Sequence, residues 1–361
     1  MKKQLRVLVF TAGDYKTASS KYRAFLLGKY LTGVRPDIVW QIVEPSTKTI
    51  SAMRYTDQIC LALSQARELF WSPRHDVVFI QRAIYNKFIF LALLLQNILR
   101  TRPSVFDFDD AIFIHSKLKT RLLCKTSSAV IAGSHHLYEY ARRYNKHVTL
   151  IPTCIKFSDY EKLKREQRGK NEVTLGWIGS GPAYIPELGF MAEVLYTLLE
   201  KGAQFKLLLI GAYNSAEIRR LFEFIPADRR SVIDYVDAKT DADLVPYFAK
   251  MDIGLMPLQN NPWNKGKCAF KAIQYMASGA PVVASPVGEN IFLITDHTTG
   301  MLATTKEEWV KSLQELIGDP ELRRQLGIVA QRLIHEQYSY ESQCNSVGEI
   351  IDTVSHHERV A

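Results

Sequence analysis

Residues 173–180, VTLGWIGS, form an apolar run that no charged residue interrupts and that ends in a small, flexible turn. Continuous Val, Ile and Leu runs, rather than alternating apolar and polar residues, are typical of strands buried on both faces, as in the parallel sheet of a doubly wound α/β domain. Helix-like segments separate this run from the next ones, which implies the order strand, helix, strand. Four further runs follow, at 205–212, 231–236, 252–258 and 280–285.

The same alternation of apolar runs and helix-like segments precedes residue 160. Six short apolar runs lie between helix-like segments, at 5–10, 37–43, 76–81, 104–110, 128–134 and 147–152, and a charged segment, 159–172, separates the two series. We therefore predict an α/β protein of two Rossmann-like, doubly wound parallel-sheet domains facing a cleft. Their predicted bounds are 1–160 and 161–335, and a final helix in 336–361 is predicted to pack back toward the first domain.

Composition excludes several classes of protein. The chain has 361 residues, of which 47% are hydrophobic and 23% charged, as in ordinary globular proteins. Its five cysteines are odd in number, scattered and never paired as C-x-x-C, which argues against a disulfide framework or a zinc site. The apolar run at 88–99 is shorter than the roughly 20 residues that span a bilayer. We expect a cytoplasmic protein without a membrane-spanning helix.

The net charge of +9 is unevenly distributed. Residues 1–160 hold 24 Lys and Arg against 11 Asp and Glu, whereas residues 161–361 hold 22 against 26. This asymmetry indicates an anionic partner for the first half, such as an acidic membrane surface or a phosphorylated substrate; a solvated basic face is the alternative. The stretch 115–125, HSKLKTRLLCK, is compatible with an anionic bilayer. Nucleic acid ranks low, because no aromatic-and-basic strand motif or basic recognition helix is present.

Two segments of the second half are suited to binding an anion. Gly179, Ser180 and Gly181 form a turn that lets backbone amides approach a negative charge, although a plain tight turn is the alternative. The glycine spacing matches neither a dinucleotide-binding motif nor a P-loop, which argues against a dehydrogenase or an ATPase. If 265–277 is a helix, Lys267, Lys271 and Gln274 form one polar stripe on it, whose alternative is a solvated face.

These segments carry a resemblance to a known family. The stretch FKAIQYMASGAPVVASPVGEN (270–290), with DIGLMPL (252–258) and GWIGS (176–180) before it, resembles the nucleotide-sugar-binding domain of the retaining, GT-B glycosyltransferases of family 4. In the first half, FDFDDAIF (106–113) and ASSKYR (18–23) resemble the bacterial polysaccharide and lipid-linked-sugar branches of that family. The resemblance implies a nucleoside-diphosphate-sugar donor, a glycan or lipid-linked acceptor, and no separate cofactor.

Family members carry two glutamates eight residues apart where this sequence has Gly266 and Gln274. An arginine and a lysine that commonly clamp the diphosphate after the first strand of this domain are also missing, and Lys267 and Lys271 are the substitutes that we expect to act in catalysis. Gln274 can still hydrogen-bond ribose hydroxyls. The donor-binding residues that we expect are Gly179, Ser180, Gln274, Tyr213, Val236, Gly288, Glu289 and Asn290.

The first half supplies the other expected site residues. Asp107 and Asp109 spell a D-x-D motif of metal-dependent transferases of another fold, but the GT-B resemblance requires no metal and we expect none. Asp109 or Asp110 is expected to orient the acceptor hydroxyl or the donor sugar, unless it caps the next helix. In the loop after the first strand, Ser19, Ser20 and Arg23 are expected to bind the acceptor, Arg23 by gripping a phosphate.

The sequence thus predicts a metal-independent, retaining glycosyltransferase at the inner face of the cell membrane, which moves a sugar from a nucleoside diphosphate to an acceptor such as a polyprenyl-diphosphate-linked glycan or a cell-surface polysaccharide precursor. Two alternatives stay open. A sugar-nucleotide epimerase of the same fold would need no acceptor. A non-catalytic nucleotide-binding scaffold would bind without turnover, because Gly266 and Gln274 replace the glutamate pair.

Overall fold

The computed structural model describes residues 4–43, 54–71, 75–82, 86–163, 173–179, 181–211, 215–233 and 241–357. Within this part of the chain, contacts between residues divide the protein into two units. Unit 1 contains residues 1–155, 266–268 and 338–361, and unit 2 contains residues 156–265 and 269–337. The chain therefore leaves unit 1 after Ile155, returns to it briefly at 266–268, and returns again with its last helix.

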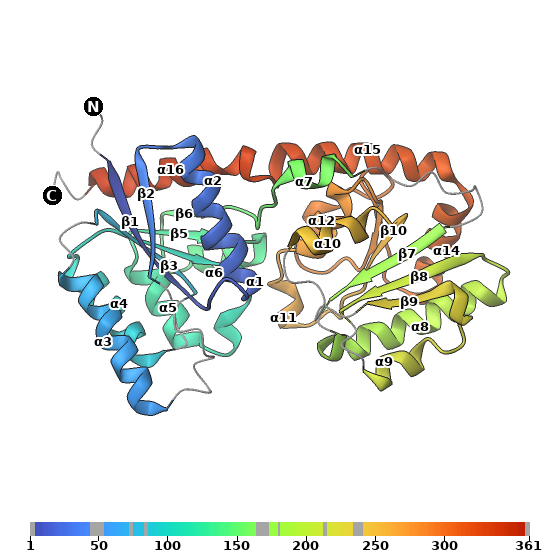
Figure 1. Ribbon diagram of the computed structural model, residues 1–361, viewed down its shortest axis with the longest axis horizontal. Helices are drawn as coiled ribbons and strands as arrows, with labels where there is room; N and C mark the ends of the chain where they lie inside the picture. Colours follow the sequence, from blue (N-terminus) through green and yellow to red (C-terminus); the bar gives the residue numbers. More distant parts are fainter. Residues whose placement is uncertain are drawn as a thin grey trace. The chain divides into compact units, whose positions relative to one another are not determined.

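Unit 1 is built on a parallel sheet in the order β2-β1-β3-β4-β5-β6 (Figure 1). Because β1 and β3 are neighbours while β2 lies outside β1, the chain reverses direction across the sheet between β1 and β3, and ligands of open α/β sheets bind at such a switch point. Its elements are β1 (Leu5–Thr11), α1 (Ala18–Ser20), the π-helical η1 (Lys21–Leu26), α2 (Leu27–Val34), β2 (Ile38–Val43), α3 (Tyr55–Trp71), β3 (Val77–Gln81), α4 (Lys87–Leu99), β4 (Ser104–Phe108), η3 (Ile112–Ile114), α5 (Lys117–Thr126), β5 (Ala129–Ala132), α6 (His135–Arg142), β6 (Val148–Leu150) and α16 (Tyr340–His357).

The sheet of unit 1 is covered on both faces, which explains its unbroken apolar strands. Helices α2 and α16 pack against each other, and α16 also contacts β3 and β4; α3, α4 and α5 form the opposite layer (Figure 1). The core on the α16 side includes Val7, Val9, Phe79, Tyr340 and Val347, all less than 2% exposed. Sequence-distant α16 is thus an integral part of unit 1.

Unit 2 holds a second parallel sheet, in the order β12-β11-β10-β7-β8-β9. Counted within the unit this is 6-5-4-1-2-3, the order of a Rossmann fold, and its switch point lies between β7 and β10. Its elements are α7 (Phe157–Glu161), β7 (Val173–Ile178), η4 (Gly181–Tyr184), α8 (Ile185–Glu200), β8 (Phe205–Ile210), α9 (Ala216–Leu221), η5 (Ala227–Arg229), β9 (Arg230–Ile233), α10 (Asp241–Phe248), β10 (Ile253–Met256), α11 (Pro262–Lys265), α12 (Phe270–Ala277), β11 (Val282–Ala284), α13 (Asn290–Leu293), β12 (Met301–Leu302), α14 (Lys306–Gly318) and α15 (Pro320–Gln337).

The core of unit 2 lies between β7, β8 and β10 and the helices α8 and α14, which pack on each other (Figure 1). Trp177 and Trp309, both at most 1% exposed, are its largest side chains. Helix α12 contacts β10 and β11 and packs on α15. Residues at the carboxyl ends of β7 and β10 therefore project from a rigid frame.

The predicted fold class is confirmed: each half forms a doubly wound parallel sheet, and each predicted apolar run overlaps a strand. The short strand β12 had no counterpart among the predicted runs. Within the described residues, no helix is both long and apolar enough to cross a bilayer.

Candidate functional site

Lys271 places a positive charge at the switch point of unit 2. Its Nζ lies 3.5 Å from the centre of the Tyr184 ring and 4.9 Å from that of Trp177. A methyl group added at Gly179 would lie only 2.6 Å from the same Nζ. The ammonium group of Lys271, from the first turn of α12, therefore lies against Gly179, the residue that directly follows β7.

The turn after β7 uses its backbone differently from the prediction. The amide of Gly179 donates to the carbonyl of Ile210 at 3.0 Å, and the amide of Gly181 donates to the carbonyl of Gly211 at 2.8 Å. These two amides continue the pairing with β8, so the prediction that they face an anion is wrong. Ser180 lies outside the described residues. The positive charge described at this end of β7 is that of the Lys271 side chain.

Gln274 is buried, with 6% of its surface exposed. Its Nε2 donates to the hydroxyl of Tyr160 at 3.0 Å, so the amide is held by α7 of the same unit. Its carbonyl oxygen is the atom that can accept a hydrogen bond from a ligand hydroxyl. Next to it, the Tyr275 hydroxyl accepts a hydrogen bond from the backbone amide of Ile178 at 2.8 Å, which fixes α12 against the end of β7.

The predicted stripe of Lys267, Lys271 and Gln274 is wrong for Lys267. Helix α12 begins only at Phe270, and Ala269 before it has the left-handed backbone angle φ +53°. An L-residue in this conformation cannot continue a right-handed helix. Lys267 therefore precedes the helix and belongs to unit 1, whereas Lys271 belongs to unit 2.

Gly266 occupies a position where no side chain fits. A methyl group there would lie 2.5 Å from Cβ of Ala111 and 2.8 Å from its backbone nitrogen. The hydroxyl of Ser134 donates to the carbonyl of Gly266 at 3.4 Å. The glycine that departs from the family's glutamate thus permits close packing of segment 266–268 on unit 1.

The loop after β11 is held from within. Gly288 has φ +60°, and a methyl group there would lie 2.8 Å from the carbonyl oxygens of both Asn264 and Lys265. Asn290 is fully buried and its Nδ2 donates to the carbonyl of Ser285 at 2.9 Å. Asn290 therefore holds the loop together through this bond, and its role in donor binding stays a prediction. Glu289 is 3% exposed. Two further predicted donor residues, Tyr213 and Val236, lie outside the described residues.

Glu187 is a buried carboxylate that the sequence analysis missed. It lies on α8, is 6% exposed, and its Oε1 accepts hydrogen bonds from Asn264 Nδ2 at 3.2 Å and from the amide of Gln259 at 3.5 Å. Asn264 Nδ2 also donates to the carbonyl of Gln259 at 2.9 Å. This network fixes the loop between β10 and α11, and no local pattern around Glu187 signals it.

In unit 1, a polar network lies at the switch point between β1 and β3. The hydroxyl of Ser19 donates to Oδ1 of Asp109 at 2.5 Å, and Nε2 of Gln81 donates to the Ser19 oxygen at 2.8 Å. Ser20 donates to Oε1 of Gln81 at 3.0 Å. Side chains that follow β1, β3 and β4 thus meet at one edge of the sheet, as the rule for parallel sheets requires.

Arg82 joins the two candidate aspartates. Its Nη1 donates to Asp109 Oδ1 at 3.1 Å and to Asp110 Oδ2 at 2.8 Å. Arg82 has φ +49°, a conformation that is costly for a residue with a side chain and that is concentrated at functional sites. Arg82 was not among the predicted site residues, although its position directly after the buried run 76–81 marks it as an edge residue.

Asp110 is the more accessible carboxylate of this pair. Its side chain is 28% exposed, against 8% for Asp109. Burial and the neighbouring charge of Asp109 raise the pKa of Asp110 to about 6, against the opposing charges of Arg82 and Lys267. Asp110 can therefore hold or release a proton close to neutral pH, whereas Asp109 is engaged by Ser19 and Arg82.

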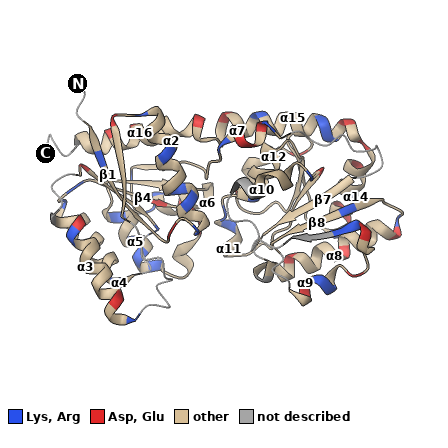
Figure 2. Cartoon of the chain, viewed as in Figure 1, with Lys and Arg blue, Asp and Glu red and all other residues tan. Residues whose placement is uncertain are grey.

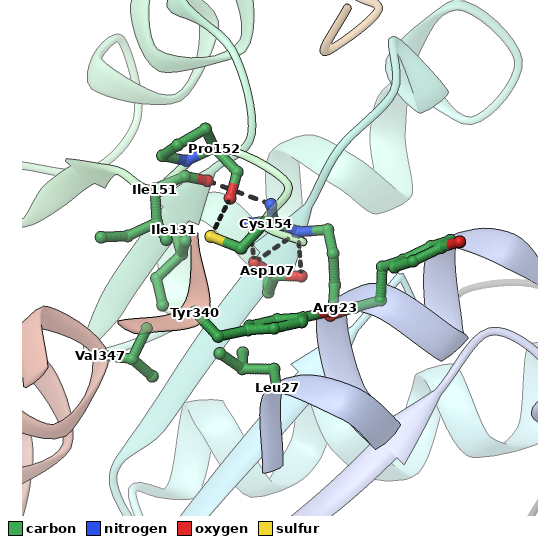
Figure 3. A pocket seen from close by; sticks show the side chains of 10 residues that line it. Arg23, Leu27, Asp107, Ile131, Ile151, Pro152, Cys154, Tyr340 and Val347 are labelled. Carbon is green, nitrogen blue, oxygen red and sulfur yellow. Dashed lines mark hydrogen bonds and ion pairs between the residues drawn. The ribbon is translucent and has the colours of Figure 1, made fainter. Parts of the chain in front are cut away.

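Arg23 and Ser20 do not present the groups that were predicted to bind an acceptor. Arg23 is 3% exposed; its Nε donates to Asp107 Oδ2 at 2.9 Å, and its Nη1 donates to the carbonyl of Ile151 at 3.0 Å (Figure 3). Burial disfavours its charge, but the charge and hydrogen bonds of Asp107 outweigh this and raise the pKa of Arg23. Ser20 is fully buried. Of the three predicted acceptor residues only Ser19 is partly exposed.

The surroundings of Arg23 explain its burial. Arg23 and Asp107 line a small pocket whose other walls include Leu27 of α2, Ile131 of β5, and Tyr340 and Val347 of α16 (Figure 3). An unpaired charge here would be costly, and the ion pair satisfies it. No cluster of three or more metal-ligating side chains is found in the described part of the chain.

Comparison with known proteins identifies the second half. Residues 172–319 match the family model described as glycosyl transferases group 1. The D-inositol 3-phosphate glycosyltransferase of Corynebacterium diphtheriae is 28% identical over 100 residues, which make up 27% of this chain and 22% of that enzyme. The chain thus matches about a fifth of the length of this relative.

Solved structures resemble the whole chain in fold. Sucrose-phosphate synthase from Thermosynechococcus elongatus superimposes with a TM-score of 0.73 at 14% identity, covering 97% of this chain and 99% of that one. Anabaena HepE, solved with UDP and glucose, gives 0.67 at 15% identity, covering 97% and 100%. The resemblance inferred from the sequence is therefore confirmed: the chain has the GT-B fold of these glycosyltransferases, and its residues 172–319 form a glycosyl transferase group 1 domain.

Proposed function

We propose that this protein is a retaining, metal-independent glycosyltransferase that takes its sugar from a nucleoside-diphosphate donor. The observation that carries the proposal is the ammonium group of Lys271, which lies at the carboxyl end of β7 beside the switch point of unit 2. This is where open α/β sheets bind nucleotides, and the same segment matches the glycosyl transferase group 1 family.

The donor class has independent support. HepE was solved with UDP and with UDP-glucose, and the starch synthase IV domain with ADP and acarbose, so proteins of this fold bind nucleoside diphosphates with different bases. In this chain, Lys271 supplies charge for the diphosphate. The carbonyl oxygen of Gln274 accepts a hydrogen bond from a ribose hydroxyl, and the loop around Gly288 and Glu289 contacts the sugar.

The chemical role of unit 2 is electrostatic. As the bond between sugar and diphosphate breaks, negative charge grows on the leaving group, and Lys271 stabilises it. In the retaining mechanism the leaving diphosphate takes the proton of the acceptor hydroxyl on the same face of the sugar. No separate metal is needed where a fixed cation meets the leaving group.

Unit 1 supplies the acceptor side of the reaction. Asp110, held by Arg82 and partly exposed, orients the acceptor hydroxyl, and Ser19 adds a second polar contact. Lys267, whose charge acts on Asp110, adds positive charge at this edge. The acceptor that we propose is a polyprenyl-diphosphate-linked glycan or a polysaccharide precursor, reached from the cytoplasmic side of the cell membrane.

A thermal-shift series tests the donor site first. The purified chain is measured with UDP, GDP, dTDP, CMP and ADP, with and without EDTA, beside the Lys271→Ala variant. A nucleotide present at 100 times its Kd stabilises the folded state by about 2.7 kcal/mol. We expect one nucleoside diphosphate to raise the Tm of the parent but not of the variant, with EDTA making no difference. Binding of none of the five would contradict the proposal.

The reaction itself is then tested with the sugar derivatives of the nucleotide that binds. Transfer to a lipid-linked or soluble glycan acceptor, with the anomeric configuration of the donor kept in the product, is the expected result. Conversion of the donor sugar without any acceptor would replace the transferase with an epimerase. Binding without turnover for all acceptors would leave a scaffold.

A further inference from the structure

Helix α4 is oriented with its apolar side chains outward. Leu91, Leu95, Ile98 and Leu99 are 57%, 48%, 60% and 59% exposed. Their spacing of four, three and one residues puts them on one face of the helix. The polar side chains of Gln96 and Asn97, by contrast, are 0% and 4% exposed. A surface helix normally buries its apolar face and exposes its polar one.

Specific hydrogen bonds hold α4 in this orientation. Nδ2 of Asn97 donates to the hydroxyls of Thr126 at 3.3 Å and Ser127 at 3.2 Å, at the end of α5. Nε2 of Gln96 donates to the carbonyl of Arg102. The side chain of Asn86 caps the start of the helix by accepting from the amides of Phe88 and Ile89. Turning the helix to bury its leucines would break the hydrogen bonds of the Asn97 and Gln96 side chains. These bonds therefore keep the apolar face of α4 exposed.

Basic residues surround this apolar face. Lys87 is the first residue of α4, and Arg100 directly follows its last. Helix α5, which packs on α4, exposes Lys117, Arg121 and Lys125 together with Leu118, which is 67% exposed. Figure 2 shows basic segments on α5 in blue. Nζ of Lys119 lies 5.4 Å from the ring centre of Phe90 and links the two helices. No aspartate or glutamate occurs in residues 77–106 or 111–138. We call the exposed residues of α4 and α5 the α4–α5 face.

We propose that the α4–α5 face docks on an anionic phospholipid bilayer, with the α4 leucines and Ile98 among the acyl chains and the lysines and arginines at the headgroups. The residue types favour lipid over protein. Interfaces between proteins are enriched in aromatic side chains. This face instead presents aliphatic side chains, and its charged side chains are all positive. Aliphatic insertion combined with basic residues is what binds helices to the surface of anionic membranes.

Vesicle sedimentation of the full chain tests the proposal. Vesicles of phosphatidylcholine with 30 mol% phosphatidylglycerol are compared with pure phosphatidylcholine, without donor or acceptor, so that the result does not depend on the proposed reaction. We expect binding to the anionic vesicles that weakens in 0.5 M NaCl, because salt screens the headgroup charge. Two charges near such a surface together change binding by roughly 30-fold, so the Lys117→Gln/Arg121→Gln variant should bind about 30-fold more weakly.

The apolar part of the face has its own variant. Leu91→Gln/Leu95→Gln changes two exposed side chains, so the protein should melt at the parent temperature and bind anionic vesicles at least about tenfold more weakly. Two variants are matched controls. Ile328→Gln changes an isoleucine of α15 that is 54% exposed, and Arg220→Gln/Lys311→Gln changes two exposed basic residues of unit 2. These should bind like the parent.

A tryptophan reports where the protein touches the bilayer. Brominated phosphatidylglycerol quenches only tryptophans that reach the acyl chains, so Leu95→Trp should gain a quenched component that Ile328→Trp lacks. Equal binding of the parent and Leu91→Gln/Leu95→Gln would overturn the proposal. A second result would also overturn it: the parent forms a dimer in solution and does not bind vesicles, and the double variant abolishes the dimer. The face would then be covered by a second copy of the chain.

Discussion

The ammonium group of Lys271 lies 3.5 Å from the centre of the Tyr184 ring, although 86 residues lie between the two in the sequence. The aromatic face attracts the cation and fixes its position before any ligand arrives. A fixed charge costs no reorganisation when a leaving group becomes negative. The pair therefore gives unit 2 a preorganised positive charge at the end of β7.

Replacing Lys271 with alanine should lower turnover strongly while leaving the fold intact. Loss of one preorganised group that stabilises developing charge typically costs about 2.7 to 4 kcal/mol in the transition state. This corresponds to a decrease of roughly two to three orders of magnitude in kcat. The measurement is kcat and KM for donor consumption, together with the Tm of each variant.

Lys250 provides the matched control for this prediction. Its Nζ lies 5.3 Å from the centre of the Tyr247 ring, so the exposed Lys250 makes the same kind of contact just after α10. Lys250→Ala should retain parent kinetics. Parent-like turnover by Lys271→Ala would remove Lys271 from the machinery of the reaction.

Replacing Arg82 with alanine should destabilise unit 1. Asp109 and Asp110 would lose the guanidinium that bonds both, and breaking a buried ion pair by removing one partner costs about 3 to 5 kcal/mol. The control is Arg324→Ala, which breaks an exposed pair with Glu321 and should destabilise the protein far less, because solvent screens exposed ion pairs. Urea unfolding of the two variants checks the contrast, and similar losses in both would contradict a special role of Arg82.

The raised pKa of Asp110 predicts a stability that depends on pH. Folding raises this pKa from an ordinary aspartate value to about 6, so between about pH 4 and 6 the folded protein holds a proton that the unfolded chain has released. The free energy of unfolding should therefore fall as the pH rises through this window, by an amount on the order of 1 to 2 kcal/mol after allowance for partial exposure. Above pH 6 this contribution should no longer change.

Unfolding by urea at several pH values tests the assignment. Asp110→Asn cannot ionise and should remove the decrease between pH 4 and 6, whereas Asp159→Asn, which alters an exposed pair with Lys156, should retain it. Lys267→Ala removes a charge that opposes the shift, so it should move the decrease to higher pH. An unchanged profile in Asp110→Asn would assign the transition to another group.

The two sheets were predictable because their signal is a local pattern. Residues 77–80 of β3 and 207–210 of β8 are apolar and buried, and such runs identify parallel strands without knowledge of any partner. The edge rule also predicted Asp109 and Asp110, since they directly follow β4. The same rule applies to Arg82, which directly follows β3, so Arg82 could also have been predicted from the sequence.

The remaining site residues depend on contacts that a sequence does not display. Arg23 lies in a polar stretch of sequence that is typical of exposed side chains, but the buried carboxylate that pairs with it is 84 residues away. The predicted stripe of Lys267 and Lys271 requires an uninterrupted helix, but the left-handed backbone of Ala269 breaks the helix between them. Such outcomes are decided by tertiary packing rather than by helical periodicity.

Restoring the family's glutamate at residue 266 should damage the protein rather than improve it. Any Cβ at Gly266 meets Ala111, so Gly266→Ala and Gly266→Glu should both lower the free energy of unfolding, by about 1 to 3 kcal/mol for the smaller change. Gly189→Ala in α8 is the control, because its added methyl group meets no atom within 4 Å, and a helical glycine replaced by alanine gains about 0.5 to 1 kcal/mol.

A second substitution shows whether Ala111 is the cause. Ala111→Gly removes the Cβ that lies 2.5 Å from the added methyl group, but the backbone nitrogen at 2.8 Å stays, so Gly266→Ala/Ala111→Gly should recover only part of the loss. Contacting residues that clash in this way show a coupling energy of about 0.5 to 3 kcal/mol in a double-mutant cycle. Additive effects would mean that the Cβ of Ala111 is not the cause of the loss, and a Gly266→Ala variant as stable as the parent would mean that residue 266 tolerates a side chain. The family's glutamate would then be missing for a reason other than packing.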